Sequence, residues 1–401
     1  MLIITAPGQG AQTPGFLAPW LELPGVAERL GTASELAGCD LVRFGTTASA
    51  DEIKDTAVAQ PLLVAAAIAA ASVLSGGEPG DVPADVAADA AAGHSVGELV
   101  AGVIAGVLAA DDAMRLVGVR GRAMAAAAAA EPTGMTAVLG GEADAVLAAI
   151  ARCGLTAANV NGAGQIVAAG TLAELEAFAA DPPAGARLRP LQVAGAFHTR
   201  HMAPAEDALA EAAQAVHARD PVRPLLSNRD GTVVRSGKDW LDRIIHQVSA
   251  PVRWDKCMQT MAGLGVTALI ELPPAGTLTG LAKRALRGIQ LVALKTPDDL
   301  DAARMLLAEH AESHADSHAP EWRLLVAPTA GVFRAPAGHP AATPPGTAVD
   351  QGSDLGHVEM RGDRHHVQSA FPATVLEWLV EDGDPVSAGQ PLVRLHPQAA
   401  D

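Results

Sequence analysis

The chain is short of positive charge and of cysteine. Its 401 residues include 28 Lys and Arg against 45 Asp and Glu, which gives a formal net charge of −17. A protein that coats nucleic acid needs the opposite sign, so general DNA or RNA binding is excluded. The three cysteines, Cys39, Cys153 and Cys257, are far apart and form no CxxC pair. We therefore expect a reduced, cytoplasmic protein without a disulfide framework or a cysteine-based zinc site.

Signals for export, membrane insertion and metal binding are also weak. Residues 1–7 lack a basic region and are too short for a signal peptide. Residues 56–77 carry no charge but are mostly alanine and contain Pro61, so we expect a buried helix and no membrane partner. His310, His314 and His318 are spaced by four, but no further carboxylate or cysteine completes a site. We predict no metal there, only a solvated helix or linker.

What the chain does contain is ample apolar mass, with 49% hydrophobic residues. Alternating strands and helices predict an α/β core with a parallel sheet, built from residues 1–127 and 196–308. Its strands are expected at 2–4, 86–92, 225–227 and 267–272, and its helices at 56–75, 111–124, 196–219, 240–248, 252–264 and 278–286. A featureless alanine run over 125–130 follows the helix expected at 111–124.

Residues 128–195 interrupt this pattern and predict a separate subdomain. Strands are expected at 135–139, 155–160, 165–169 and 187–193, with helices at 142–153 and 172–180. The order βαββαβ is that of an inserted ferredoxin-like subdomain. After a linker at 309–322, short apolar runs between Gly and Pro turns predict a small all-β domain over 323–401.

The pentapeptide Gly93-His94-Ser95-Val96-Gly97 has the GxSxG form. A nucleophilic serine on a tight strand-to-helix turn has a strained backbone, and its neighbours must be tiny. The Val96 N–H at the start of the following helix could then stabilise an oxyanion. The pattern also arises by chance in a chain rich in alanine and glycine, but the expected strand before it and helix after it favour a nucleophile.

Other candidate site residues each have a second interpretation. His198 could be the base that a serine nucleophile needs or a structural histidine, and His201 competes with it. Gln9, in Gly8-Gln9-Gly10, could supply a second oxyanion donor or belong to an ordinary turn. Arg120, in an apolar helix segment, could meet an anion or extend to the surface.

These elements together resemble malonyl-CoA:acyl-carrier-protein transacylases, the acyltransferases of type II fatty acid or polyketide synthesis. The resemblance covers about residues 2–300 and its motifs are highly specific as a set. The matching motifs are 7–12 (PGQGAQ), 93–98 (GHSVGE), 120–124 (RGRAM), 159–165 (NVNGAGQ), 196–198 (AFH), Gln247 before 250–254 (APVRW), and 271–281. Two loops depart from the family pattern, with Pro273-Pro274-Ala275 after Glu271, and Ala163 where a proline is usual; they put loop shape in doubt.

The resemblance implies a Ser–His dyad that works by a ping-pong mechanism. Ser95 would take the malonyl group from malonyl-CoA, His198 would act as the base, and Gln247 would position His198. Backbone N–H groups of Gln9 and Val96 would form the oxyanion hole. Arg120 would pair with the malonyl carboxylate, and Phe197 would favour malonyl over methylmalonyl. No bound cofactor is implied.

The implied partner is an acidic acyl carrier protein. Candidate docking cations are Lys283, Arg284, Arg287, Arg187 and Arg189, which could equally form a solvated basic face. The sequence leaves the oligomeric state and the identity of the carrier open.

The C-terminal region resembles a biotinyl/lipoyl domain, a flattened barrel of two similar halves. Residues 326–332 (VAPTAGV) parallel residues 369–375 (SAFPATV), and residues 381–392 resemble the second turn and strand of that family. Active members carry a modifiable lysine at a hairpin tip, but here that position falls on Gly362, and no lysine follows Lys295. Attachment of biotin or lipoate to a lysine of this domain is therefore excluded, and we expect a docking or oligomerisation element.

Two other functions stay open. The same fold could use another acyl donor or hydrolyse thioesters, although a neutral acyl group would leave Arg120 without a partner. A non-catalytic scaffold is the other alternative, and the set of Ser95, His198, Arg120 and Gln247 argues against it.

Overall fold

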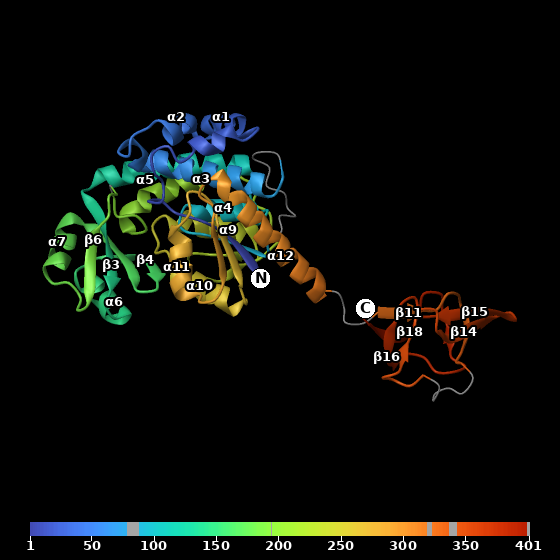
Figure 1. The fold of residues 1–401 in the computed structure, drawn as a ribbon. Helices are drawn as coiled ribbons and strands as arrows, with labels where there is room; N and C mark the ends of the chain where they lie inside the picture. Colours follow the sequence, from blue (N-terminus) through green and yellow to red (C-terminus); the bar gives the residue numbers. More distant parts are fainter. Residues whose placement is uncertain (78–87, 194, 319–322, 337–342, 399–401) are drawn as a thin grey trace. The chain divides into compact units, whose positions relative to one another are not determined.

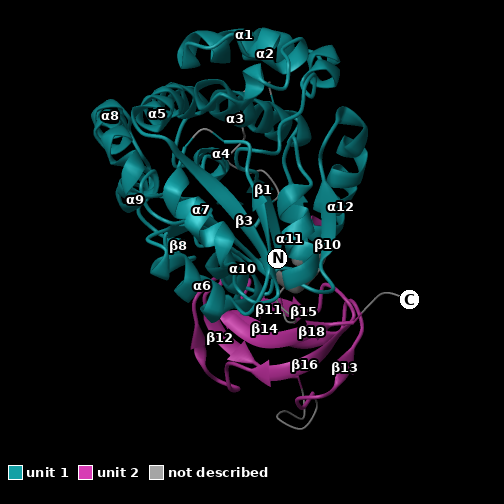
Figure 2. Ribbon diagram, turned by 90° about the vertical axis from the view of Figure 1, so that its left-hand side faces the viewer, with its two compact units in different colours: residues 1–310 teal, residues 311–401 magenta. Residues whose placement is uncertain are grey.

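The computed structural model describes residues 1–77, 88–193, 195–318, 323–336 and 343–398. The chain divides into two compact units, residues 1–310 and residues 311–401 (Figure 2). Each unit is described by itself.

A six-stranded sheet forms the centre of the first unit, in the order β10-β9-β1-β2-β7-β8 (Figure 1). Its strands are β1 (Leu2–Ala6), β2 (Ala90–Gly93), β7 (Leu225–Leu226), β8 (Val233–Val234), β9 (Ala268–Glu271) and β10 (Gln290–Ala293). Adjacent strands are parallel except β7 and β8. The predicted parallel α/β core is therefore confirmed, and β10 is a strand that the sequence pattern did not indicate.

Helices cover both faces of this sheet because both faces are apolar. Successive side chains of each strand point to opposite faces. Leu2 and Ile4 of β1 belong to the larger hydrophobic cluster, together with apolar side chains of α1, α3, α4, α5, α8 and α9, whereas Ile3 belongs to a second cluster with α10 and α11. The helices of this unit are α1 (Val26–Ala37), α2 (Leu41–Thr46), α3 (Thr56–Leu74), α4 (Gly97–Ile104), α5 (Ala110–Ala130), α6 (Ala143–Arg152), α7 (Leu172–Ala180), α8 (Ala203–Ala213), α9 (Gly237–Gln247), α10 (Trp254–Gly263), α11 (Thr277–Ala285) and α12 (Leu300–His318), which continues into the second unit.

Helix α3 is long and apolar enough to cross a membrane by length and composition. In this fold 83% of its most apolar window is buried inside the protein. Its burial on all sides explains why it lacks a polar face. It is a core helix, as the uncharged stretch predicted.

The insertion between α5 and α8 has the predicted order βαββαβ. Its antiparallel sheet runs β4-β5-β3-β6, with strands β3 (Thr133–Gly140), β4 (Thr156–Gly162), β5 (Gln165–Thr171) and β6 (Ala186–Pro190). Val138 and Ile166 pack on α6 and α7 on one face. Ala137 and Val167, on the opposite face, join the main core. The inserted sheet is thus held against the rest of the unit by its own apolar face.

Two predicted helices have different limits. Helix α5 continues past its predicted end at residue 124 through the alanine run 125–130, because alanine has the highest helix propensity. The helix expected over 196–219 is confined to Ala203–Ala213. Residues 196–199 form a loop, since His198 has a φ of 60° that no α-helix accommodates. The segment expected as a linker, residues 309–322, begins as the end of α12. Part of the strand expected at 86–92 lies outside the described residues.

The second unit contains two antiparallel sheets of four strands, β11-β18-β16-β13 and β15-β14-β12-β17. The strands are β11 (Arg323–Val326), β12 (Gly331–Arg334), β13 (Ala348–Val349), β14 (Asp354–Met360), β15 (Asp363–Gln368), β16 (Ala373–Trp378), β17 (Pro385–Val386) and β18 (Pro391–Pro397). Phe333, Val358 and Leu392 are fully buried in its own hydrophobic core. The β14–β15 hairpin pairs Met360 with Asp363, so Arg361 and Gly362 form its turn.

Candidate active site

Ser95 lies on the turn between β2 and α4, with a left-handed backbone at a φ of 54°. Two glycines make this turn possible. A Cβ on Gly97 would lie 2.2 Å from the carbonyl oxygen of Ala6, and one on Gly93 would lie 2.0 Å from the backbone of Gly97. Only glycine lets helix α4 approach β1 and β2 this closely. The GxSxG pattern therefore forms the strained strand-to-helix turn that the sequence predicted.

The hydroxyl of Ser95 meets the imidazole of His198. Ser95 Oγ is 2.8 Å from His198 Nε2, and His198 Nδ1 is 2.9 Å from the backbone carbonyl oxygen of Gln247. A carbonyl only accepts, so Nδ1 carries the proton and Nε2 is free to accept from the serine. His201, the competing histidine, lies instead 2.9 Å from the carboxylate of Glu131.

Burial sets the protonation state of His198. The ring is 4% exposed. Desolvation, and then the charge of Arg120, lower the pKa of His198 from 6.5 to about 3. The imidazole is therefore neutral at physiological pH, the form in which it can accept a proton.

Arg120 brings a buried positive charge to the same place. Its side chain is 2% exposed, and desolvation lowers its pKa to about 10, so it remains charged at neutral pH. Nη2 donates to Ser95 Oγ at 3.3 Å and to Gln247 Oε1 at 3.2 Å, while Nη1 donates to Gln60 Oε1 at 2.7 Å. Among the described residues, no carboxylate lies within ion-pair distance of this guanidinium. A buried cation beside the serine, held by neutral groups, is suited to an anionic ligand.

Gln247 has two contacts in the site. Its backbone carbonyl accepts from His198, and its side-chain oxygen accepts from Arg120. The side-chain Nε2 of Gln247 is buried without a hydrogen-bond partner among the residues described. One residue thus contacts both the imidazole and the guanidinium.

The two candidate oxyanion donors lie on the turns that follow the adjacent strands β1 and β2. Val96 caps the N-terminus of α4, and Gln9 follows β1, where its side chain donates to the Lys54 carbonyl and to Thr56 Oγ1, both at 3.3 Å. Within the described part of the chain, the backbone N–H groups of Gln9 and Val96 donate to no other backbone group. Phe197, next to His198, is 5% exposed and belongs to the main hydrophobic cluster.

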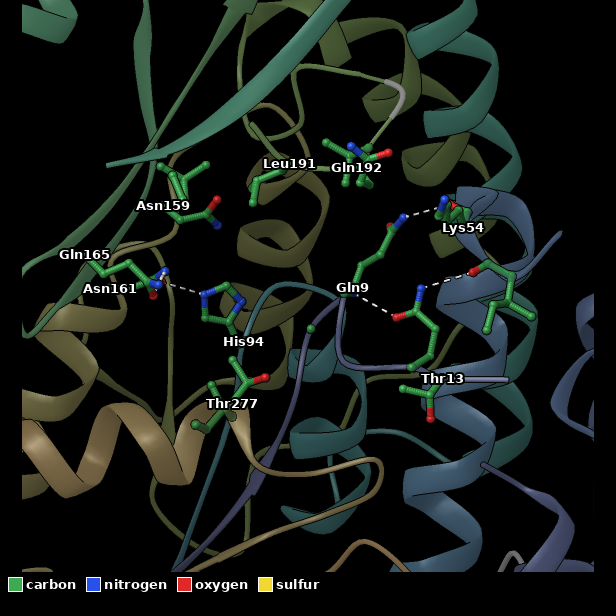
Figure 3. A pocket seen from close by; sticks show the side chains of 18 of the residues that line it. Gln9, Thr13, Lys54, His94, Asn159, Asn161, Gln165, Leu191, Gln192 and Thr277 are labelled. Atoms are coloured by element: carbon green, nitrogen blue, oxygen red, sulfur yellow. Dashed lines mark hydrogen bonds between the residues drawn. The ribbon is translucent and has the colours of Figure 1, made fainter. Parts of the chain in front are cut away.

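A cleft of about 550 Å³ opens beside the serine turn. Gln9 and Lys54 lie on one side of it, and Asn159, Asn161 and Gln165 from the inserted sheet lie on the other (Figure 3). His94 contacts the insert, with its Nε2 2.9 Å from Asn161 Oδ1. Asn161 in turn donates to Gln165 at 3.0 Å. The cleft therefore receives polar side chains from both parts of the first unit.

Three residues of this site were not predicted from the sequence. Gln60 contacts Arg120, and Lys54 lines the cleft. The side chain of Asn228 accepts a hydrogen bond from the backbone N–H of Ser95. Gln60 could have been noticed as a single amide within an uncharged apolar helix. Asn228 has no comparable local signal, because its partners lie far away in the sequence.

In the described residues, no three His, Cys, Asp or Glu side chains gather as a metal site would require. His310 forms an ion pair with Asp89 at 2.5 Å, and the side chains of His314 and His318 lie outside the described residues.

Comparisons with known proteins agree with this geometry. The model of the acyl transferase domain family matches residues 7–317. The malonyl CoA-acyl carrier protein transacylase of Mycobacterium bovis is 53% identical over 301 residues, covering 75% of this chain and 98% of that protein. The crystal structure of MCAT from Mycobacterium tuberculosis matches with a TM-score of 0.72 and 52% identity, over 76% of this chain and 99% of that one.

A solved complex of a type II PKS acyl-carrier protein with its malonyl-transacylase also matches, with a TM-score of 0.69 and 30% identity over 76% of this chain and 99% of that one. The family resemblance noted in the sequence is confirmed. The chain belongs to the malonyl-CoA:acyl-carrier-protein transacylases of the acyl transferase family.

Proposed function

We propose that this protein transfers the malonyl group from malonyl-CoA to the phosphopantetheine thiol of an acyl carrier protein, through a malonyl ester on Ser95. The observation that carries the proposal is the buried guanidinium of Arg120, 3.3 Å from Ser95 Oγ. A malonyl thioester has a carbonyl to attack and a carboxylate at its far end. The relatives that share this fold carry the same activity in their names.

In the first half-reaction, Ser95 Oγ attacks the thioester carbonyl while His198 Nε2 takes the hydroxyl proton. The N–H groups of Gln9 and Val96 hold the oxyanion that forms. When the C–S bond breaks, the thiolate of CoA takes the proton from His198 and leaves as the thiol. In the second half, His198 deprotonates the incoming pantetheine thiol, whose sulfur attacks the ester carbonyl. The new C–S bond forms, the C–O bond to Ser95 breaks, and Ser95 Oγ takes the proton back from His198.

Arg120 selects the substrate. Its Nη groups pair with the malonyl carboxylate. This charge-assisted pair, in a site that excludes water, replaces the contacts of the guanidinium with neutral groups. Gln247 keeps both the imidazole and the guanidinium in place. Phe197 narrows the space beside the α-carbon, and discrimination by one methyl group is worth only about 1–3 kcal/mol, so some transfer of methylmalonyl is expected. Acetyl and other neutral acyl groups have no charge to pair with Arg120. Malonyl transfer is therefore favoured over thioester hydrolysis and over transfer from another acyl donor.

The carrier protein docks at the mouth of the cleft. Ala137 and Val167 line the cleft, and Arg189 is paired with Ala137 in the inserted sheet, so Arg187 and Arg189 share the face that borders it. Lys283, Arg284 and Arg287 are exposed after Leu281, which also lines the cleft. These cations match an acidic carrier.

The insert has the strand order and βαββαβ connectivity of a ferredoxin-like subdomain, and we place it at residues 128–195 between core segments 1–127 and 196–308. We assign residues 323–401 to a domain of the biotinyl/lipoyl type, and the two four-stranded sheets in its described part suit a flattened barrel. Its β14–β15 turn holds Arg361 and Gly362, and no lysine follows Lys295. This barrel therefore carries neither biotin nor lipoate, and the enzyme needs no bound cofactor.

We place the enzyme in the cytoplasm. Cys39, Cys153 and Cys257 are all free thiols, which suits a reducing compartment. Helix α3 is a buried core helix, and the proposed substrates are cytoplasmic metabolites.

The direct test is malonyl transfer from malonyl-CoA to a carrier protein. We expect transfer to the holo carrier, which has the pantetheine thiol, none to the apo carrier, and none by Ser95→Ala. Equal labelling of holo and apo carrier would contradict transfer to the thiol. Release of free malonate as the main product would favour the hydrolase alternative.

A further inference from the structure

We propose that Asn228, on the loop after β7, is a positioning residue that holds the Ser95 turn in its reactive conformation. This inference rests on the proposed function, since it concerns the same serine. Asn228 touches neither Ser95 Oγ nor any group assigned to the substrate, and it is placed to act through the backbone of the turn alone.

The side chain of Asn228 clamps the turn on both sides of the nucleophile. Its Oδ1 accepts the backbone N–H of Ser95 at 2.7 Å. Its Nδ2 donates to the backbone carbonyl of Gly93, also at 2.7 Å. One amide group therefore ties together the residue before His94 and the residue after it.

The clamp matters because the turn is strained. A non-glycine residue such as Ser95 with a φ of 54° persists only where its surroundings over-determine it. The peptide that follows Ser95 carries the Val96 N–H, so the same backbone angle sets the direction of Oγ and of one oxyanion donor. Loss of the clamp would misdirect both groups together.

Asn228 is itself rigidly held. It is fully buried, and its backbone N–H donates to the carboxyl of Glu98 at 2.8 Å. Glu98 lies on α4, the helix that begins just after Ser95. Asn228 Nδ2 also lies 3.7 Å from Cys257 Sγ on α10. The clamp thus connects the serine turn to the start of α4 and to the helix layer behind the sheet.

The discriminating variant is Asn228→Asp, because its effect depends on protonation. A protonated aspartic acid has the shape of asparagine, with an oxygen to accept from Ser95 and a hydroxyl to donate to Gly93. The ionised form keeps the acceptor but loses the donor. The titratable groups nearest this position are Glu98 on α4 and Cys257 on α10, and Asp230, Asp255, Arg243 and Arg120 act on these two from farther away.

The experiment measures kcat and KM for malonyl transfer by the full-length parent, Asn228→Ala, Asn228→Asp and the control Ser227→Ala. Ser227 is also buried on this loop, but within the described ranges its hydroxyl accepts a hydrogen bond only from the backbone of Arg229. We expect Asn228→Ala to lower kcat by about 100-fold with KM for malonyl-CoA nearly unchanged. Ser227→Ala should retain kcat within about 3-fold.

We further expect the kcat of Asn228→Asp, relative to the parent at each pH, to rise as the pH falls, because protonation restores the donor. Should Asn228→Ala fail to fold, this ratio still decides the question. A ratio that is flat or that falls toward acid would overturn the proposal, as would a loss in Ser227→Ala equal to that in Asn228→Ala. A parent that does not transfer malonyl would refute the proposed function instead.

Discussion

At the scale of single residues, the reactive state of the site follows from burial. His198 is neutral because water is excluded from it, and Arg120 remains charged although desolvation opposes the charge. Ser95 is the point at which the two meet. A buried cation that only neutral groups hold, among the described residues, is costly, and the proposed malonyl carboxylate would explain its retention.

Arg120→Ala tests this explanation. We expect malonylation of Ser95 to slow by about 100-fold, because a charge-assisted pair is lost, while acetylation from acetyl-CoA is unchanged or faster. The rates of both acylations should be measured side by side on the same preparation. A variant that keeps the full rate with malonyl-CoA would remove Arg120 from substrate recognition.

The low pKa of His198 makes a second prediction. With a folded pKa of about 3, the imidazole stays neutral, and the rate of Ser95 acylation should be flat between about pH 8 and 5. The rate is best followed as CoA release in a single turnover. A loss of half the rate near pH 6.5, the ordinary pKa of histidine, would mean that this ring is far more hydrated than its burial indicates.

At the scale of elements, the turn from β2 into α4 is the part most dependent on close packing. Gly97 approaches the Ala6 carbonyl too closely for any Cβ. Gly31, inside α1, has open space at the same position. These two glycines therefore form a matched pair for mutation.

Gly97→Ala should lower the free energy of unfolding by about 1–3 kcal/mol, since α4 must move away from β1, and should slow Ser95 acylation more than about 10-fold. Gly31→Ala should raise stability by about 0.5–1 kcal/mol, because alanine favours the helix. Denaturant unfolding and the acylation rate test both. Equal behaviour of the two variants would show that the turn is not limited by packing.

Glu98 gives the same element a pH dependence. Burial raises the pKa of Glu98 from 4.5 to about 8, so the folded state binds a proton that the unfolded state releases. Its contribution to stability is complete below pH 4.5 and is lost as the pH rises through about 8. The titration of His198 has the opposite effect, because the contribution of His198 to protein stability is lost as the pH falls from 6.5 toward 3.

Glu98→Gln keeps an oxygen for the Asn228 N–H and removes the titration. Between about pH 6.5 and 8.5 we expect the parent to lose on the order of a few kcal/mol of unfolding free energy, and the variant to lose much less. Parallel slopes for parent and variant would show that Glu98 is already ionised in the folded protein.

Local patterns in the sequence predicted much of this arrangement. The glycines around Ser95, the apolar strands and the βαββαβ order of the insert are all short-range features, and their elements were predicted. Contacts made over long sequence distances were not. The bond from Arg120 to Gln60 and the bonds from Asn228 to the serine turn depend on how α3, α5 and the loop after β7 pack. His198 likewise has a positive φ, and a loop stands where a helix was predicted. Tertiary contacts override helix propensity at this position.

At the scale of the whole molecule, the transferase and the β unit have separate hydrophobic cores. The family match ends at residue 317, and the M. bovis relative is covered over 98% of its own length by 75% of this chain. The family match therefore covers nearly all of the first unit and ends before β11, the first strand of the β unit.

A chain cut after residue 318 should retain malonyl transfer within about 3-fold and unfold cooperatively. Lower carrier affinity or a changed oligomeric state in the truncated chain would assign the β unit a role in docking or assembly. Unchanged carrier affinity and assembly would remove that role. The full chain should gain no mass with a biotin ligase or a lipoate ligase and their substrates, and a gain located in residues 323–401 would refute the lysine argument.

The most direct measurement is the intact mass of the protein after brief incubation with malonyl-CoA, beside acetyl-CoA and the Ser95→Ala variant. We predict one malonyl adduct on the parent, little acetyl adduct, no adduct on Ser95→Ala, and loss of the malonyl mass when holo carrier protein is added. A folded parent that gains no mass and releases no CoA, or an adduct that persists in Ser95→Ala, would contradict malonyl transfer through this serine.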